Sequence, residues 1–490
     1  MQKHLNGHLL GTLAFGLVLT GTAQQQPATL STSSPPPKAP PSAGLVNDWL
    51  RDQSPSLKVI DIGGQVRARY EFKDDMAVPG LSPQAVDFRA QGGEENSYLL
   101  LREKIHLGYT PVDWVTGYVE ARNSATYWDN RQPSPESDVF DLHQAYIKLG
   151  NPKEFPLSLK VGRQELTYGD ERLIGAFDWN NIGRVFDAAK VRFESPDLWV
   201  DAFVSRVIIP DDNNFNQPND YDFLSGVYAS SKTLIPCQES QLYFLARNVG
   251  EQSPYAIGEN LPPFMRGASP RDIYTVGARV KSLPGKLAGW DYEAEVAGQF
   301  GDFQASPTSP ELQQRAYATH AAGGYTWTET FGTPRVGLEY NFSSGDSNSK
   351  DGTHGTFDNL FPTNHKFYGF MDFFSWQNMH DLRLATSIKP AKKLTLTGDF
   401  HAMWLADTHD FFYQVNGAPR TTGGYGIHPG AGNFVGTELD IVASYSLTPY
   451  ASAQTGYGHF FVGDYVNYTM NPVGGATDAN WVFVQLLLNF

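Results

Sequence analysis

Basic residues separated by a single position recur along this chain, and their types and spacing point to chemistry. Three such pairs are Arg67 and Arg69, Arg102 and Lys104, and Lys190 and Arg192. In a β-strand, residues two positions apart point to the same face. Guanidinium and ammonium groups that share a face bind carboxylates and other anions. The spacing therefore predicts an anion-binding wall built on strands.

Further arginines extend this pattern. Arg279 and Arg383 fall on the polar faces of their own strands, and Arg163 and Arg184 bracket a long segment between two strands. Arg163 has the parity of apolar neighbours, so a bulge or the start of a loop is needed to turn it inward. Three acidic residues near this segment are expected to pair with the arginines and keep them aimed: Asp170, Asp178 and Asp187.

Acidic residues also occupy the polar faces of several strands. They are Glu71, Glu120, Glu293, Glu295, Glu339, Asp381, Asp399 and Asp440. Two outcomes are open. These carboxylates either fix the arginines by pairing with them, or they cancel the positive field and make a channel unselective.

The sequence carries no recognisable signature of other chemistry. The chain has one cysteine, no zinc-ligand spacing among its histidines and no G-x-S-x-G nucleophile motif. We therefore expect no catalytic residues, no cofactor and no metal site. The net charge of −15 disfavours nucleic acid as a partner.

The elements that must position the basic residues are strands. From residue 58 onward, segments of about ten residues alternate in polarity, and short turns alternate with long polar loops. In RVGLEYNF (335–342), Val336, Leu338 and Tyr340 share one face opposite Arg335 and Glu339. The spacing predicts an all-β transmembrane antiparallel barrel of about eighteen strands, with short periplasmic turns and long extracellular loops.

Aromatic residues and the two ends of the chain support this architecture. Five aromatics flank short turns and predict a girdle at the membrane interface: Tyr109, Trp114, Tyr118, Trp290 and Trp327. Residues 1–23 have the features of a secretory signal peptide, and residues 24–57 are expected to form a Pro/Ser-rich periplasmic spacer before a barrel over 58–490. The last strand ends on Phe490, as in barrels inserted by the outer-membrane assembly machinery, which predicts location in a bacterial outer membrane.

One segment resembles a known family. Residues 162–193 carry Gly162-Arg163-Gln164, Tyr168-Gly169-Asp170, Asp178-Trp179, Gly183-Arg184 and Phe186-Asp187, and this set is similar to the signature of the alginate-export family of outer-membrane barrels. The resemblance implies a monomeric barrel with a narrow electropositive constriction, lined by arginines, that passes an anionic polysaccharide. It also implies a periplasmic export partner.

The function expected from these features is a channel for an anionic polysaccharide or other anionic solutes. The loop after Tyr168 is too apolar for a solvated tip, so it is expected to fold inward and narrow the channel. A general nutrient porin is the alternative. A secreted β-rich hydrolase or carbohydrate-binding protein is a third reading, of a different class.

Overall fold

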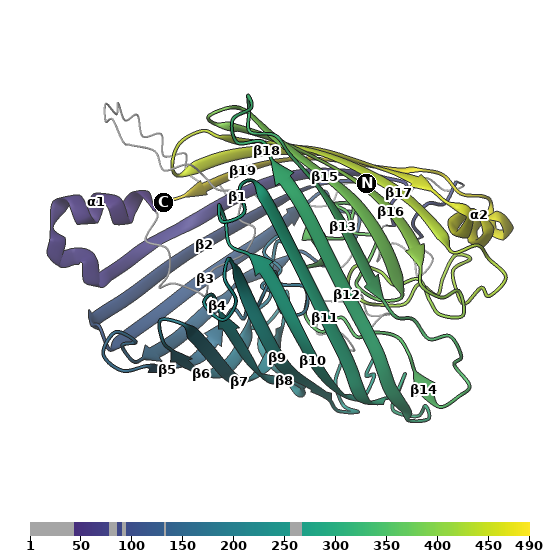
Figure 1. The fold of residues 1–490 in the computed structure, drawn as a ribbon, viewed down its shortest axis with the longest axis horizontal. Coiled ribbons are helices and arrows are strands. Elements are labelled where there is room, and N and C mark those ends of the chain that lie inside the picture. The colour runs from purple at the N-terminus through teal and green to yellow at the C-terminus, as the bar shows by residue number, and fades with distance from the viewer. Residues whose placement is uncertain (1–43, 78–85, 91–94, 132–133, 255–266) are drawn as a thin grey trace, which may run out of the picture.

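The computed structural model is one antiparallel sheet closed into a barrel (Figure 1). It describes residues 44–77, 86–90, 95–131, 134–254 and 267–490. The expected signal peptide and residues 24–43 lie outside this part of the chain. The sheet has 19 strands, of which 18 form the wall and the short β14 lies in a loop. This is the barrel that the alternation in the sequence predicts.

The strands follow one another around the wall in chain order. They are β1 (Ile60–Asp74), β2 (Asn96–Val112), β3 (Val115–Tyr127), β4 (Asp138–Leu149), β5 (Leu157–Gln164), β6 (Phe186–Glu194), β7 (Leu198–Ile209), β8 (Gln217–Ser231), β9 (Gln238–Val249), β10 (Arg271–Ser282), β11 (Trp290–Phe303), β12 (Leu312–Thr326), β13 (Arg335–Ser343), β14 (Thr353–His354), β15 (Met379–Ala391), β16 (Leu394–Leu405), β17 (Phe434–Ser446), β18 (Ala451–Val462) and β19 (Ala479–Asn489). Strand β1 pairs with both β2 and β19, so the wall has no free edge.

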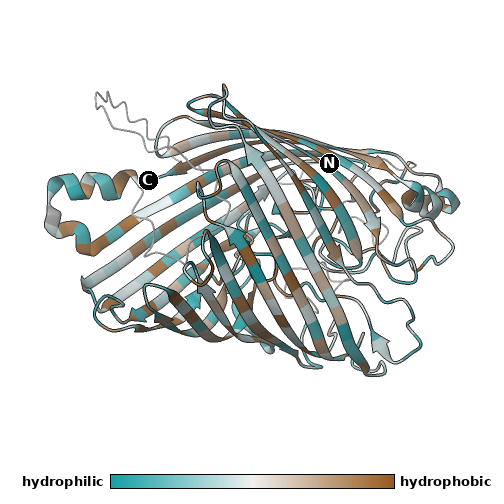
Figure 2. Cartoon of the chain, in the orientation of Figure 1, coloured by the Kyte–Doolittle hydropathy of each residue, from teal (hydrophilic) through white to brown (hydrophobic). Residues whose placement is uncertain are grey.

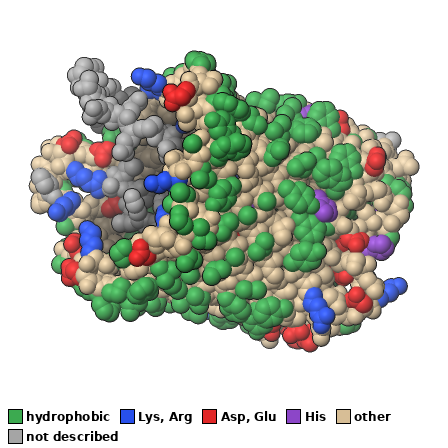
Figure 3. Space-filling model, viewed as in Figure 1, with side chains coloured by type: hydrophobic (Ala, Val, Ile, Leu, Met, Phe, Trp, Pro, Cys, Tyr) green, Lys and Arg blue, Asp and Glu red, His purple; other side chains and the backbone are tan. Residues whose placement is uncertain are grey.

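Hydrophobic and hydrophilic residues alternate along many of the strands (Figure 2). The apolar residues of this alternation are exposed on the outside of the wall, and many charged residues are buried inside it. On β19, Val484, Leu486 and Leu488 are exposed on the outside, whereas Trp481 and Phe483 are buried within. Hydrophobic side chains cover much of the middle of the outer surface in Figure 3, and charged ones gather toward the ends. Such a band suits contact with lipid, where an outward arginine at mid-depth would cost about 2–4 kcal/mol.

The short turns and long loops lie at opposite ends of the barrel (Figure 1). We assign the end with short turns, α1 and the C-terminus to the periplasm, as in other bacterial barrels. Four of the five girdle aromatics are exposed there: Tyr109, Trp114, Trp290 and Trp327. The fifth, Tyr118, was wrongly predicted as part of the girdle. It is buried on the inward face, because its parity is that of Glu120.

The expected spacer ends earlier than predicted, since residues 45–57 are not irregular. Leu45–Gln53 form α1, and Pro55–Val59 form the 3₁₀ helix η1. The buried Asn47 ties α1 to β1, because its side chain donates to Asp61 and accepts from the backbone N–H of Ile62 at 2.9 Å. Helix α2 (Asp464–Met470) and η4 (Asn471–Val473) lie in the last long loop, and η3 (Asn364–Lys366) lies in the loop that carries β14. No helix in the described ranges is long and apolar enough to cross a membrane.

Candidate functional site: loops inside the barrel

Two long loops enter the barrel and contact each other there. One joins β5 to β6 (residues 165–185), and the other joins β13 to β15 (residues 344–378). The backbones pair where Ile174 bridges Phe361, with Gly175 N–H donating to the Phe361 carbonyl at 2.8 Å. Apolar side chains from both loops form part of a buried cluster inside the wall, including Leu173, Ile174, Phe361 and Trp376. The interior is therefore filled with protein at this level.

Inward arginines of the first strands hold the tip of the β5–β6 loop, residues 177–184. Arg67 donates to the carbonyl of Asp178 at 2.7 Å, and Arg102 donates to the same carbonyl at 2.9 Å. Arg69 donates to the carbonyl of Trp179 at 2.6 Å. Charge-assisted bonds of this kind are stronger than bonds between neutral groups. The arginines thus fix the loop tip against β1 and β2.

Carboxylates of β17 hold the second loop in the complementary way. Glu438 accepts a hydrogen bond from the backbone N–H of Met371 at 2.8 Å, and Asp440 accepts one from Phe370 at 3.2 Å. Both carboxylates are on the inward face of β17 and are buried. Wall cations therefore bind carbonyls of one loop, and wall anions bind N–H groups of the other.

Trp179 joins the two loops to the wall. Its ring stacks on His365 of the second loop with centroids 4.1 Å apart, and the Arg69 guanidinium carbon lies 3.8 Å from the ring centroid. Its edge meets Phe483 of β19 at 5.2 Å. These contacts explain why the lumenal face of β19 carries aromatic side chains, since they receive the loop tip.

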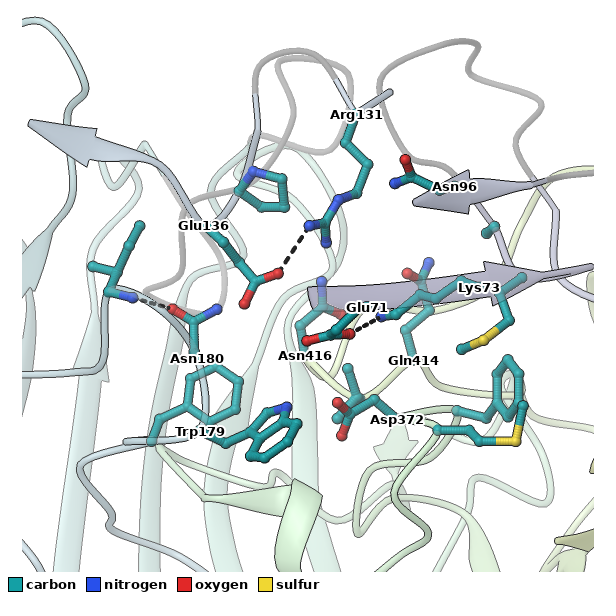
Figure 4. Close-up of a pocket in the computed structure, with 18 of the residues that line it drawn as sticks. Glu71, Lys73, Asn96, Arg131, Glu136, Trp179, Asn180, Asp372, Gln414 and Asn416 are labelled. Atoms are coloured by element: carbon teal, nitrogen blue, oxygen red, sulfur yellow. Dashed lines mark hydrogen bonds and ion pairs between the residues drawn. The ribbon is translucent and has the colours of Figure 1, made fainter. Parts of the chain in front are cut away.

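Two vestibules lie on either side of the loop tip. The outer one, of about 210 Å³, is lined by Trp179, Asn180 and side chains of the extracellular loops (Figure 4). The inner one, of about 330 Å³, is lined by Asp178, Lys104 and the C-terminal Phe490, among others. Asp178 lines the inner vestibule and the adjacent Trp179 lines the outer one, so the loop tip lies between the two spaces.

The structure gathers five of the predicted site residues at this separation. Arg67, Arg69, Arg102, Lys104 and Asp178 all contact the loop tip or belong to it. The Asp178 carboxylate lies 2.9 Å from Arg102 and 3.7 Å from Lys104, and its side chain is 64% exposed to the lumen. It is the most accessible charge of the group.

The remaining inward site residues are distributed around the wall. Arg279 pairs with Asp170 at 2.8 Å and with Glu293 at 2.7 Å. Arg383 pairs with Glu339 and Asp399. Lys190 and Arg192 share a single carboxylate, Asp201. Arg184 donates to the Pro362 carbonyl at 2.8 Å and so joins the two loops.

Arg163 and Asp187 do not belong to this interior set, and the prediction that they do is wrong. They pair with each other at 2.9 Å, at opposed positions of β5 and β6. The register of β5 with both neighbours is unbroken, so no bulge turns Arg163 away from the outward face of Val161. Asn216 and Phe215 of the β7–β8 loop cover it instead.

Several residues that hold the inward loops were not predicted from the sequence. Arg122 donates to the Ile182 carbonyl, Asn181 bonds to the backbone of Leu101, and Arg172 reaches Glu339 at 2.9 Å. Arg122 could have been found by parity, because it follows the inward Glu120 by two positions. Arg172 and Asn181 lie in a loop without periodicity, so no signal marked them.

One group of side chains in the described ranges has the composition of a metal site. Glu120, His143 and Glu165 bring ligand atoms within 4.8 Å of one another. The Lys104 ammonium already lies 3.6 Å from Glu120 and 3.8 Å from Glu165. Arg122 faces the Nδ1 of His143 at 3.2 Å. We interpret the group as an ion-pair network.

A closed 18-strand barrel with an apolar belt and inward loops defines a channel of the bacterial outer membrane. The family model described as alginate export matches residues 58–476. The chain therefore belongs to the alginate-export family, as the motif in 162–193 predicts. Family and fold indicate a channel and not an enzyme.

Solved structures of similar fold come from Pseudomonas aeruginosa. OpdO is 13% identical with a TM-score of 0.53, covering 88% of this chain and 97% of that chain. OccK2 (OpdF), in complex with glucuronate, is 12% identical with a TM-score of 0.52, covering 88% and 98%. OpdK with vanillate is 11% identical with a TM-score of 0.52 and the same coverage. No curated protein matches this chain.

Proposed function

We propose that this channel passes anionic solutes, either an alginate-like polysaccharide or smaller acids, beside the tip of the β5–β6 loop. The proposal rests on one observation, which is that arginine side chains of the wall lie directly behind that tip. The Arg67 guanidinium bonds to the carbonyls of Asp178 and Asn180, which carry no net charge. Its positive charge is therefore only partly balanced at the place where the two vestibules meet.

The proposed pore-lining residues are those predicted from the sequence that face the lumen. They are Arg67, Arg69, Arg102, Lys104, Arg184, Lys190, Arg192, Arg279, Arg383, Asp170 and Asp178. The arginines act here mainly as positioning residues, because they hold the loops that shape the passage. A fixed ring of cations raises the local concentration of anions in a narrow, low-dielectric pore.

Related folds support the class of solute. The structures of OccK2 and OpdK were obtained with glucuronate and vanillate, and both compounds carry a carboxylate. A carboxylate solute is also the natural ligand for basic side chains on a strand face.

A general nutrient porin remains the second candidate, because the wall from β13 to β17 carries many carboxylates. Glu339, Asp381, Asp399, Glu438 and Asp440 all face inward on β13, β15, β16 and β17. If their field cancels that of the arginines, the passage discriminates by size alone.

Reversal potentials in a potassium chloride gradient separate the two candidates. We expect purified protein in planar bilayers to prefer chloride. Arg67→Gln with Arg102→Gln should lower the chloride-to-potassium permeability ratio. Arg163→Ala is the matched control, since this arginine faces away from the lumen, and it should leave the ratio unchanged. An unselective or cation-selective wild type would support the general porin instead.

Assembly and partners complete the proposal. The signal peptide directs export, the barrel-assembly machinery recognises the strand that ends at Phe490, and the mature protein works as a monomer in the lipid bilayer. A periplasmic export partner delivers the polymer to the inner vestibule, if a polymer is the solute.

A further inference from the structure

Three lysines lie side by side on the lumenal face at the periplasmic half of the wall. Lys148 of β4 is in register with Lys160 of β5, and Lys160 is in register with Lys190 of β6. The residues that alternate with them, such as Ile147 and Val191, are exposed on the outside. We call Lys148, Lys160 and Lys190 the lysine row.

A single carboxylate serves one end of the lysine row. Lys190 lies 3.5 Å from Asp201, which also binds Arg192 at 2.5 Å and accepts a hydrogen bond from the Tyr168 hydroxyl at 2.9 Å. Arg192 and Tyr168 thus occupy most of the hydrogen-bond acceptor sites of the Asp201 carboxylate.

Lys148 and Lys160 differ from the other inward cations of the strands. In the described part of the chain, neither ammonium has a carboxylate within 4.0 Å. The Lys160 ammonium instead lies 3.6 Å from the centroid of the Tyr146 ring. Like charges at opposed positions destabilise a strand pair. An anion placed between the two ammonium groups would offset that repulsion.

The surroundings indicate what kind of anion fits. Lys160 and Tyr146 line the inner vestibule together with hydrogen-bonding side chains of Gln65, Gln144 and Thr167. The carboxylates that also line it, those of Glu120, Glu165 and Asp178, lie 3.6, 3.8 and 3.7 Å from the Lys104 ammonium and are thus paired with that lysine. Tyr146 stacks on Tyr118 at 5.1 Å, which gives the vestibule one flat aromatic wall. Ammonium groups suit a carboxylate, and amides and hydroxyls suit the hydroxyls of a polyol or sugar.

We propose that Lys148 and Lys160 bind the carboxylate of a sugar acid on the periplasmic side of the loop tip. This inference rests on the proposed function and assigns the contact to the solute to lysines, whereas the arginines shape the passage. The carboxylate belongs either to a free sugar acid or to a unit of an acidic polysaccharide.

Side-specific block of single channels tests the proposal. Sodium glucuronate is added to either side of a bilayer that holds one oriented channel, and a uronic-acid oligosaccharide is tested in the same way. We expect stronger block from the periplasmic side. Lys148→Gln with Lys160→Gln should weaken that block by at least about tenfold, the loss expected from bonds to charged groups. Tighter block by the oligosaccharide than by glucuronate would identify the polymer as the source.

Lys153→Gln is the matched control, because Lys153 is an exposed lysine in the turn between β4 and β5. It should leave the block unchanged. Equal block from both sides, or full block in the double variant, would overturn the lysine assignment while the chloride preference of the wild type stood. A wild type that prefers potassium would instead overturn the proposed function.

Thermal unfolding supplies a readout that does not depend on conduction. Removal of two repelling charges should not lower the unfolding temperature of the ligand-free barrel. Glucuronate should raise that temperature for the wild type and not for the double variant. A double variant that is less stable without ligand, or is stabilised by glucuronate as the wild type is, would contradict the proposal.

Discussion

At the scale of single residues, the arginines of β1 and β2 direct their donors to backbone carbonyls of a loop. Parity in the sequence was sufficient to place Arg67, Arg69 and Arg102 in the lumen. It was not sufficient to find their partners, because the carbonyls of Asp178 and Trp179 belong to a loop more than 75 residues away in the chain. Side-chain type also says nothing about which backbone atoms a loop presents.

Arg69→Ala should loosen the loop tip. The substitution removes the bond to the Trp179 carbonyl and leaves the buried Glu71 without its closest cation, at 2.7 Å. An uncompensated buried group costs about 1–3 kcal/mol. We expect faster hydrogen exchange at residues 177–184 and a larger single-channel conductance. Arg163→Ala is the control, because it also removes bonds to backbone carbonyls, but outside the lumen. It should change neither the hydrogen exchange of residues 177–184 nor the conductance. Unaltered hydrogen exchange at the loop tip of Arg69→Ala would show that the bond from Arg69 is not needed to hold the tip.

At the scale of elements, strands and loops differ in how far the sequence defines them. The period of two in the sequence predicts the strands of the wall, and the spacing between these segments predicts the alternation of short and long connections. It could not give α1, whose place depends on Asn47 meeting Asp61 and Ile62, nor the pairing of Ile174 with Phe361. Such contacts join segments with no common local pattern. The error at Arg163 has a related cause, since a neighbouring loop buries an outward charge without any bulge.

Trp179→Ala should uncouple the two loops. The change removes the stack on His365 and the contact with Phe483. Because Trp179 is half-buried against the interior cluster, the substitution should cost less than the about 3–5 kcal/mol lost with a fully buried tryptophan. We expect increased exchange in residues 364–372 as well as in the mutated loop. Trp128→Ala is the control, because Trp128 is 75% exposed. Effects confined to residues 165–185 would argue against coupling.

Asn47→Ala should release α1 from the barrel. Its side chain makes the two bonds that join the helix to the start of β1, and the Ile62 N–H would lose its acceptor. We expect protease cleavage within residues 45–53 while the barrel remains intact. Asn130→Ala, at the opposite end of the barrel, should leave the cleavage rate at the wild-type value. A resistant α1 in Asn47→Ala would mean that other contacts hold it.

At the scale of the whole molecule, closure between β1 and β19 makes the barrel one cooperative sheet. The last residue takes part, because Phe490 and Gly64 exchange two backbone hydrogen bonds of 2.9 Å. Arginines on β1 and β2 and carboxylates on β15 to β17 then occupy nearby parts of the wall, because only β18 and β19 separate β17 from β1. The net effect of these two groups on a passing ion decides what the channel conducts.

Deletion of Phe490 should impair assembly more than conduction. The deletion removes the bonds that complete the β1–β19 seam at the periplasmic end. We expect less heat-modifiable barrel in outer-membrane fractions, and normal conductance from the molecules that do assemble. Wild-type amounts of barrel with altered conductance would place Phe490 at a functional site instead.

Carboxylate solutes are proposed to pass this channel in preference to cations. The most direct test is the reversal potential of single wild-type channels in a gradient of potassium glucuronate. We expect a potential with the sign set by glucuronate, so that the organic anion carries most of the current. A potential with the sign set by potassium would contradict this proposal.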